Sequence, residues 1–187
     1  MQLYIKNMVC NRCKMVVKAE LEKLGFNPIS IELGDIKIKE ESISDDEKQA
    51  LQATLNKFGF ELLTEKKEQL VEQVKTAIIE LVHYTKETLK VNLSDYLNEK
   101  LGVEYANLSA TFSEYEHQTI EKYFIAQKIE KVKELLTYGE KSLSEIAYEL
   151  NYSSVAHLSN QFKKVTGETP TAYKLTRNTN RKTLNEV

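Results

Sequence analysis

NLSDYLNEKLGVEYANLSATF, at residues 92–112, is the most informative segment of this chain, because its pattern recurs 50 positions later as SLSEIAYELNYSSVAHLSNQF at residues 142–162. Seven positions are identical in the two copies, far more than two unrelated stretches of this length would share. Two copies are too few for a solenoid, so the repeat indicates one duplicated structural unit. The identical pairs are Leu93/Leu143, Ser94/Ser144, Glu99/Glu149, Ala106/Ala156, Leu108/Leu158, Ser109/Ser159 and Phe112/Phe162.

Each copy has the sequence pattern of a helix-turn-helix. It opens with a side-chain oxygen at the position of a helix N-cap and an acid three residues later. Apolar residues then recur at helical spacing, a short turn intervenes, and a second helix begins near Ala106 or Ala156. The alternative interpretation is a duplicated helical hairpin that only packs. The capping pairs are Asn92 with Asp95 and Ser142 with Glu145.

Composition places the chain among soluble, globular proteins. Its 187 residues suffice for one or two domains with real cores, and it is 41% hydrophobic and 29% charged. The first ten residues alternate apolar and polar side chains without a long apolar run. We therefore expect neither a signal peptide nor a membrane span, and a cytoplasmic location.

Charge is distributed unevenly, although the net charge of the whole chain is only −2. So small a charge does not by itself attract nucleic acid. Residues 91–127 carry two lysines and six acids, a net charge of −4, whereas residues 153–187 carry six bases and two acids, a net charge of +4. The two repeat units lie in opposite electrostatic fields, so any DNA binding must come from local arrangement.

The first 64 residues predict the element order β-α-β-β-α-β. Apolar and polar residues alternate in the strands, Gly25 ends the first helix, and Gly34-Asp35 between two apolar runs is typical of a hairpin. We therefore expect an α+β protein, with an N-terminal ferredoxin-like domain at residues 1–64 followed by an all-α tandem helix-turn-helix domain. The expected elements are strands at 2–7, 29–33, 36–38 and 60–63, and helices at 13–24 and 45–58, the latter capped by Ser44.

Two more helices are expected outside the repeats. Residues 65–90 have balanced charges, an apolar stripe and neither Gly nor Pro, which predicts an amphipathic linker helix. We expect its stripe to pack on the C-terminal domain, with a second subunit as the alternative. Residues 120–138 form the helix between the repeat units, and at 1.5 Å per residue it spans roughly 27 Å. Two helices held by such a strut reach adjacent major-groove segments, ~34 Å apart, if the DNA bends.

Two runs in the second unit resemble a known signature. SLSEIAYELNYSS at 142–154 and LSNQFKKVTGETPTAY at 158–173 closely resemble AraC-type transcription regulators, and the resemblance extends over about residues 70–175. It implies a seven-helix DNA-binding domain, at 91–175 here, in which one monomer bridges two major-groove segments of double-stranded DNA. Residues 176–187 then form a polar, basic tail. Asn160 and Lys128 depart from basic residues common in such proteins, which bears on sequence preference more than on fold.

The residues themselves predict a reading face. With Val155, Leu158, Phe162 and Val165 turned inward, the second recognition helix exposes two lysines for phosphate or guanine, an asparagine for adenine and a small alanine that permits close approach. The corresponding face of the first unit has almost no cations. Solvent exposure without DNA contact is the alternative for the histidine and both lysines. The candidate DNA-binding residues are Ala106, Asn107, Ala110 and Ser113, beside Glu114, in the first unit, and Ala156, His157, Asn160, Lys163 and Lys164 in the second.

The two cysteines form a separate motif, MVCNRC at residues 8–13, between the first strand and the first helix. Two thiols at a helix N-terminus can face one side, and the helix dipole favours their thiolate forms. Paired soft sulfurs suit Cu(I), whereas Zn(II) requires more ligands. A thiol redox switch and a retained fold without a ligand are the alternatives.

This motif and its β-α-β-β-α-β frame resemble the heavy-metal-associated domain of copper chaperones and metal-transporting ATPases over residues 1–64. The resemblance implies that Cys10 and Cys13 are ligands for Cu(I) or Zn(II) and that Met8 anchors the loop in the core. Asn7 stands where that family usually has glycine.

Together these patterns favour a non-enzymatic, DNA-binding transcription regulator with a soft-metal-sensing or docking domain. The chain has no phosphate-binding Gly-rich loop and no plausible catalytic triad. The alternative is a metal chaperone or interaction protein whose helical half binds a protein partner. Expected partners are double-stranded DNA and, beyond it, a metal carrier or RNA polymerase, with no membrane, and the chain is expected to be a monomer or a homodimer.

Overall fold

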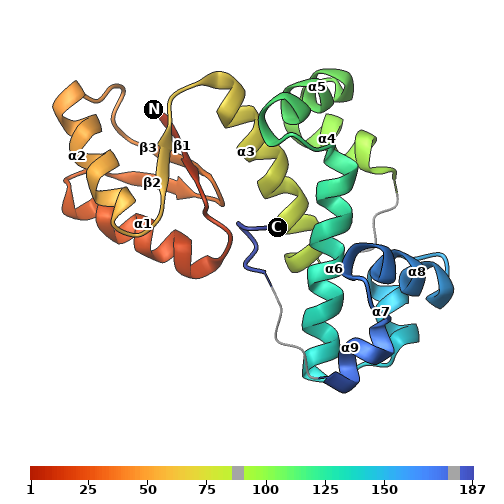
Figure 1. The fold of residues 1–187 in the computed structure, drawn as a ribbon. Helices are drawn as coiled ribbons and strands as arrows, with labels where there is room; N and C mark the ends of the chain where they lie inside the picture. Colours follow the sequence, from red (N-terminus) through yellow and green to blue (C-terminus); the bar gives the residue numbers. More distant parts are fainter. Residues whose placement is uncertain (86–90, 177–181) are drawn as a thin grey trace.

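The computed structural model describes residues 1–85, 91–176 and 182–187, which form a small sheet-containing part and a helical part (Figure 1). The sheet-containing part has strands β1 (Gln2–Lys6), β2 (Pro28–Ile31), β3 (Asp35–Ile38) and β4 (Glu61–Leu63). Its helices are α1 (Asn11–Lys23) and α2 (Asp45–Asn56). The order β-α-β-β-α-β is therefore the predicted one, with boundaries shifted by a few residues.

The four strands pair antiparallel in the order β2-β3-β1-β4. Both helices cover one face of this sheet, because alternate strand residues and the apolar stripes of the helices form one buried cluster. Ser44 caps α2 as predicted, in a reciprocal capping box with Glu47. Assignment to the ferredoxin-like fold stays a prediction. The central members of the cluster are Leu3, Ile5, Val17, Leu21, Ile36, Ile38, Leu51 and Leu55.

Asn7 ends β1 in a left-handed conformation, with φ of 71°. Among non-glycine residues asparagine tolerates this region best, which explains how it replaces the expected glycine. Its side chain also donates a hydrogen bond of 2.9 Å to the carbonyl of Gly59. The turn that leads into the cysteine loop is therefore fixed at both backbone and side chain.

The helical part has seven α-helices among the described residues. They are α3 (Lys66–Ile79), α4 (Leu93–Leu101), α5 (Tyr105–Glu116), α6 (Ile120–Tyr138), α7 (Leu143–Glu149), α8 (Val155–Thr166) and α9 (Pro170–Thr176). The bounds of α6 are the predicted ones. The predicted linker helix at 65–90 is shorter than expected, because α3 continues only as a π-helical turn, η1 (Glu80–Tyr84), and Thr85 is extended. Residues 86–90 of that prediction, and 177–181 of the predicted tail, lie outside the described residues.

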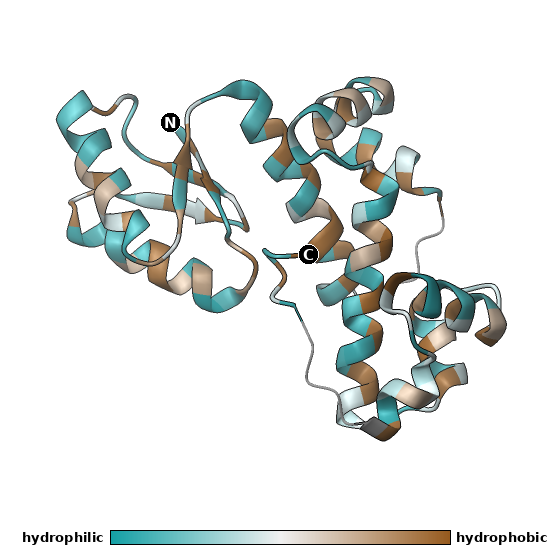
Figure 2. Cartoon of the chain, in the orientation of Figure 1, coloured by the Kyte–Doolittle hydropathy of each residue, from teal (hydrophilic) through white to brown (hydrophobic). Residues whose placement is uncertain are grey.

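Two apolar clusters hold the helical part. One joins α3, α4, α5 and the first half of α6, and the other joins the second half of α6 to α7, α8 and α9. The long helix α6 therefore belongs to both clusters and holds the two helix-turn-helix units together (Figure 1). Figure 2 shows hydrophobic positions of α3 and α6 where the two helices lie side by side.

Helix α3 is buried on two sides. Val74 and Ile78 are fully buried against α4, α5 and α6, which confirms that the linker helix packs on its own C-terminal domain. On the other side, Glu72 and Thr76 meet the sheet-containing part. The carboxylate of Glu72 accepts a hydrogen bond of 3.0 Å from the backbone N–H of Asn7. Glycine suits position 34 here, because the Cβ atom of any other residue would lie 3.1 Å from the Thr76 hydroxyl, which is closer than an ordinary contact.

A buried polar residue of α6 links three segments. The side chain of Gln127 is fully buried, and its oxygen contacts a ring nitrogen of His83 in η1 at 3.0 Å. Its amide nitrogen donates to the Tyr123 hydroxyl at 2.9 Å and to the carbonyl of Leu184 at 3.0 Å. The backbone N–H of Lys182 adds a bond of 3.1 Å to Glu130. Residues 182–187 thus lie against α6, between the two parts (Figure 1).

Burial of Glu72 predicts a pH dependence of stability. Burial raises the pKa of this carboxyl, so the folded state holds its proton more tightly than the unfolded chain. The resulting stabilisation is complete below the ordinary glutamate value of about 4.3 and is lost as the pH rises through the raised pKa. Glu72→Gln keeps the acceptor for Asn7 without the charge. We expect its free energy of unfolding to exceed that of the wild type at neutral pH and to converge with it near pH 4.

Urea unfolding curves between about pH 4 and 8 measure this difference. Glu41→Gln, at an exposed position of the same part, serves as the control and should show no such convergence. Parallel pH profiles for Glu72→Gln and the wild type would contradict the prediction.

Candidate nucleic-acid interface

The second helix-turn-helix unit is fixed by caps at both of its helices. Ser142 and Glu145 form the predicted capping box at the start of α7. The turn that follows includes Asn151 in a left-handed conformation, and Ser154 then caps α8 by accepting a hydrogen bond of 3.0 Å from the His157 backbone. Leu158 and Phe162, on the inner face of α8, are buried. This helix therefore presents its outer face in a defined orientation.

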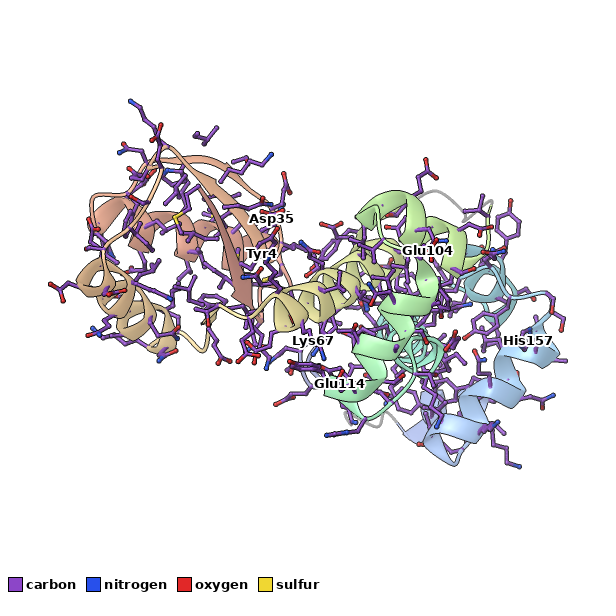
Figure 3. All side chains as sticks on the ribbon, turned by 90° about the horizontal axis from the view of Figure 1, so that it is seen from above. Tyr4, Asp35, Lys67, Glu104, Glu114 and His157 are labelled. Carbon is purple, nitrogen blue, oxygen red and sulfur yellow. The ribbon has the colours of Figure 1, made fainter. Side chains whose placement is uncertain are left out.

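The outer face of α8 carries the five residues that the sequence predicts for DNA contact. All five are exposed, and Figure 3 shows His157 on the side of the molecule away from the sheet-containing part. One expectation about the inner face is wrong: Val165 is 49% exposed, because the last turn of α8 extends beyond the cluster that contains Phe162. Contact with DNA stays a prediction for Ala156, His157, Asn160, Lys163 and Lys164.

His157 has more local partners than a free surface residue. Its ring packs edge-on against Tyr152, with centroids 5.3 Å apart, and its Nδ1 lies 3.0 Å from the Ser153 hydroxyl. Tyr152 in turn donates a hydrogen bond of 2.8 Å to Gln161. These contacts favour a role for His157 in holding the turn before α8.

The first unit presents a different face. Ala106, Asn107 and Ala110 of α5 are exposed as projected, whereas Ser113 is half-buried. Glu114, which the projection placed beside this face, forms an ion pair of 2.9 Å with Lys67 of α3, and the two side chains approach one another in Figure 3.

Glu116 similarly pairs with Lys75 at 3.2 Å. The acidic end of α5 therefore contacts α3, a partner that a helical projection of α5 alone does not include.

The cysteine loop lies at the start of α1. Cys10 is the N-cap residue, and its sulfur lies 3.2 Å from that of Cys13, too far for a disulfide bond. Burial raises the pKa of Cys13, and the hydrogen bond with Cys10 raises it further. Burial also acts on Cys10, but hydrogen bonds from Cys13 and Arg12 outweigh it and lower the pKa of Cys10. The loop thus pairs one thiol that ionises readily with one that resists ionisation.

Two further observations bear on this loop. Met8 is 1% exposed, as expected for an anchor in the core. Within residues 1–85, 91–176 and 182–187, no group of three or more His, Cys, Asp or Glu side chains could hold a metal ion. The two sulfurs therefore have no third ligand of these types among the described residues.

A contact that the sequence did not predict joins this loop to the helical part. The hydroxyl of Tyr84, the last residue of η1, donates a hydrogen bond of 2.6 Å to the carbonyl of Val9. Burial, followed by the charges of Cys10 and Cys13, raises the pKa of Tyr84 and keeps it protonated as a donor. Residues 75 positions apart meet here, and no local pattern could have indicated it.

The two helix-turn-helix units, joined by α6, define a tandem helix-turn-helix fold, and comparisons with known proteins agree with this fold. Residues 97–176 match the family model of a helix-turn-helix domain. The xylose operon regulatory protein of Escherichia coli K12 is 29% identical over 99 residues, which is 52% of this chain and 25% of that protein. The same protein of Escherichia coli O157:H7 matches equally. The chain thus spans about a quarter of the length of these relatives.

Solved structures show the same fold. A DNA-binding transcriptional dual regulator from Escherichia coli K-12 has a TM-score of 0.50 at 18% identity, covering 58% of this chain and 91% of that one. The C-terminal domain of AraT, a response regulator from Geobacillus stearothermophilus, has a TM-score of 0.51 at 24% identity, covering 64% and 94%. The helical part of this chain therefore has the fold of a helix-turn-helix domain and is similar to these regulators. The relatives are regulators and not enzymes, which agrees with the expected non-enzymatic class.

No helix among the described residues is long and apolar enough to cross a membrane.

The cap of α8 gives a testable prediction. Replacing Ser154 with alanine removes the acceptor for the His157 backbone N–H, and loss of such a cap costs about 1 kcal/mol. Urea unfolding of Ser154→Ala should show this loss. Ser153→Ala removes only the contact with the His157 ring, so it is the matched control and should cost clearly less. Equal stability of Ser154→Ala and the wild type would show that the cap does not hold α8.

Proposed function

We propose that the chain is a sequence-specific transcription regulator that binds double-stranded DNA through α5 and α8. The observation that carries this proposal is the outer face of α8. An asparagine and two lysines are exposed there on a helix that is capped at its start and buried on its inner side. Asparagine can pair with adenine in the major groove, and lysines can meet phosphate. The names of the similar proteins, an operon regulatory protein and a DNA-binding transcriptional regulator, support the same assignment, as does the AraC-type resemblance.

The length of α6 supports binding of both helix-turn-helix units to one DNA duplex. From its first to its last residue α6 spans roughly 27 Å, which is somewhat less than the ~34 Å between successive major-groove segments. A modest bend in the DNA closes that difference. The two units should contribute unequally to DNA affinity. Exposed lysines lie on α8, whereas the acidic end of α5 forms ion pairs with α3.

This inequality predicts different effects for two substitutions. Lys164→Ala should weaken DNA binding uniformly across sequences and reduce the slope of log affinity against log salt by about 1, because one phosphate contact is lost. Glu114→Ala should change DNA affinity much less, since its carboxylate pairs with Lys67. Fluorescence anisotropy with labelled duplexes at several salt concentrations measures both. Equal losses would show that the two units grip DNA alike.

Suitable duplexes can be found by capturing genomic fragments with the purified protein, with and without Cu(I). Enrichment of defined fragments is the expected outcome. Absence of enrichment under both conditions would refute the regulator and would favour an interaction protein whose helical half binds a protein partner, such as RNA polymerase or a metal carrier. Sedimentation of the captured complex distinguishes a monomer from a homodimer.

We further propose that Cys10 and Cys13 bind a soft metal ion, with Cu(I) preferred over Zn(II). The observation that favours this is the pair of facing thiols with no third ligand of the types that Zn(II) needs. Bound there, Cu(I) would replace the two thiol protons, so the site would change from neutral to a net charge of −1. The heavy-metal-associated resemblance supports this binding. Reversible thiol oxidation is the competing role for the same pair.

The contact between Tyr84 and Val9 supports coupling between this loop and the DNA-binding part. Val9 directly precedes Cys10, so a change at the sulfurs acts on the segment that Tyr84 holds. From η1, Glu80 forms an ion pair of 2.5 Å with Lys100 at the end of α4. His83 of the same turn reaches Gln127 of α6. The first helix-turn-helix unit and the connecting helix α6 are thus each two contacts from the cysteine loop.

Removing one hydroxyl tests this coupling. We expect Tyr84→Phe to retain Cu(I) binding at the cysteines, followed by competition with a colorimetric chelator, but to lose most of the effect of Cu(I) on DNA affinity. Tyr138→Phe, at a tyrosine that is 63% exposed in α6, is the control and should respond like the wild type. The coupling proposal fails if Cu(I), Zn(II) and oxidant all leave wild-type affinity unchanged, or if Tyr84→Phe responds fully.

A further inference from the structure

A cleft between the two helix-turn-helix units has no role in the proposed function. It has a volume of about 930 Å³ and lies between η1, α6 and α7. Its apolar and aromatic lining includes Leu81, Tyr84, Phe124, Tyr148 and Leu150. This size and this lining are typical of sites for small organic molecules. We call it the inter-unit cleft.

One cation in the inter-unit cleft lacks a counterion. The ammonium group of Lys128 lies 3.7 Å from the centre of the Tyr152 ring and 5.5 Å from that of Phe124. No ion pair joins it to an acid of the described residues, and burial alone lowers the pKa of Lys128 to about 8. By contrast, Lys131 pairs with Glu134 at 3.5 Å, and Lys141 pairs with Glu149. Lys128 is therefore the lysine of this cleft without a carboxylate partner among the described residues, while a further acid, Glu145, also lines the cleft and is held by Ser142.

A half-buried lysine without a carboxylate partner costs free energy, because its charge has lost part of its water without gaining a carboxylate. The two aromatic rings return only part of that cost. Such a group at the wall of a cleft is a candidate for ligand binding, since an anion would complete its interactions. One lysine without a carboxylate partner, beside aromatic walls, matches an anion with a single charge and an apolar body.

We propose that the inter-unit cleft binds a small organic monocarboxylate, with the carboxylate at Lys128 and the apolar body against Tyr84, Phe124 and Tyr148. The lining of the site does not include the cysteines. Its walls come from η1 and from the α7 surface opposite to Ile146 and Ala147, which pack into the second unit's core. A ligand here would touch the second helix-turn-helix unit and the turn that contacts the cysteine loop at once, so it would act as an effector of the DNA-binding part.

The test uses 2-naphthoate as the probe, with the neutral isostere 2-naphthamide beside it. Isothermal titration should show binding of 2-naphthoate to the wild type, with the amide weaker by at least about tenfold, as expected for a lost charge-assisted contact. Lys128→Gln should weaken 2-naphthoate binding by a similar factor. Lys164→Gln, on the outer face of α8, should leave it unchanged. Equal binding of acid and amide, or full binding by Lys128→Gln, would overturn the proposal.

Two further measurements keep the outcome decisive. Lys128→Met retains the apolar contact with Tyr152, so a normal melting temperature for this variant together with weak 2-naphthoate binding would separate charge from folding. If Lys128 instead meets DNA phosphate, Lys128→Gln will lower the salt slope of DNA binding by about 1, and the proposal fails. The proposal also fails if none of benzoate, 2-naphthoate and decanoate binds the wild-type protein at millimolar concentration.

Discussion

The structure depends on the burial of α3 on two sides. A helix that faces solvent on one side needs only one apolar stripe, but α3 is covered by helices on one side and by the sheet-containing part on the other. Ile78 fills the first contact, and Glu72 with its partner Asn7 closes the second. Because both contacts share one rigid helix, the two parts hold a fixed orientation. Without that constraint the cysteine loop would have no defined relation to the DNA-binding helices.

The repeat explains how much could be predicted. Identical pairs such as Leu108 with Leu158 and Phe112 with Phe162 are buried, so the repeated pattern reports a core and therefore a fold. The bounds of α6 and the caps at Ser44 and Ser142 followed from local signals, since caps and apolar spacing are properties of neighbouring residues. The predicted positions of helix ends that have no such signal were less accurate.

The remaining features depend on contacts between distant residues. Glu114 belongs to an ion pair with Lys67, which a projection of α5 alone could not include. The bond from Tyr84 to Val9, and the unpaired state of Lys128, likewise follow from how separate helices pack. Sequence patterns thus located the candidate DNA face and the thiol pair. The contacts of η1 with the cysteine loop and with α6, which lie between them, became visible only in the structure. Differences between the two repeat units, more than their identities, carry the proposed division of labour.

The buried amide of Gln127 also has a consequence for biosynthesis. Its acceptor at Leu184 is 57 residues further along the chain, and ribosomes add about 5 to 20 residues per second. About 3 to 11 seconds therefore pass between the synthesis of Gln127 and that of Leu184, and this bond cannot form earlier. Until then the Gln127 amide lacks its Leu184 acceptor, so this contact forms only after α6 and the second helix-turn-helix unit have been synthesised. The sheet-containing part, whose cluster uses only residues 3–62, has no such delay.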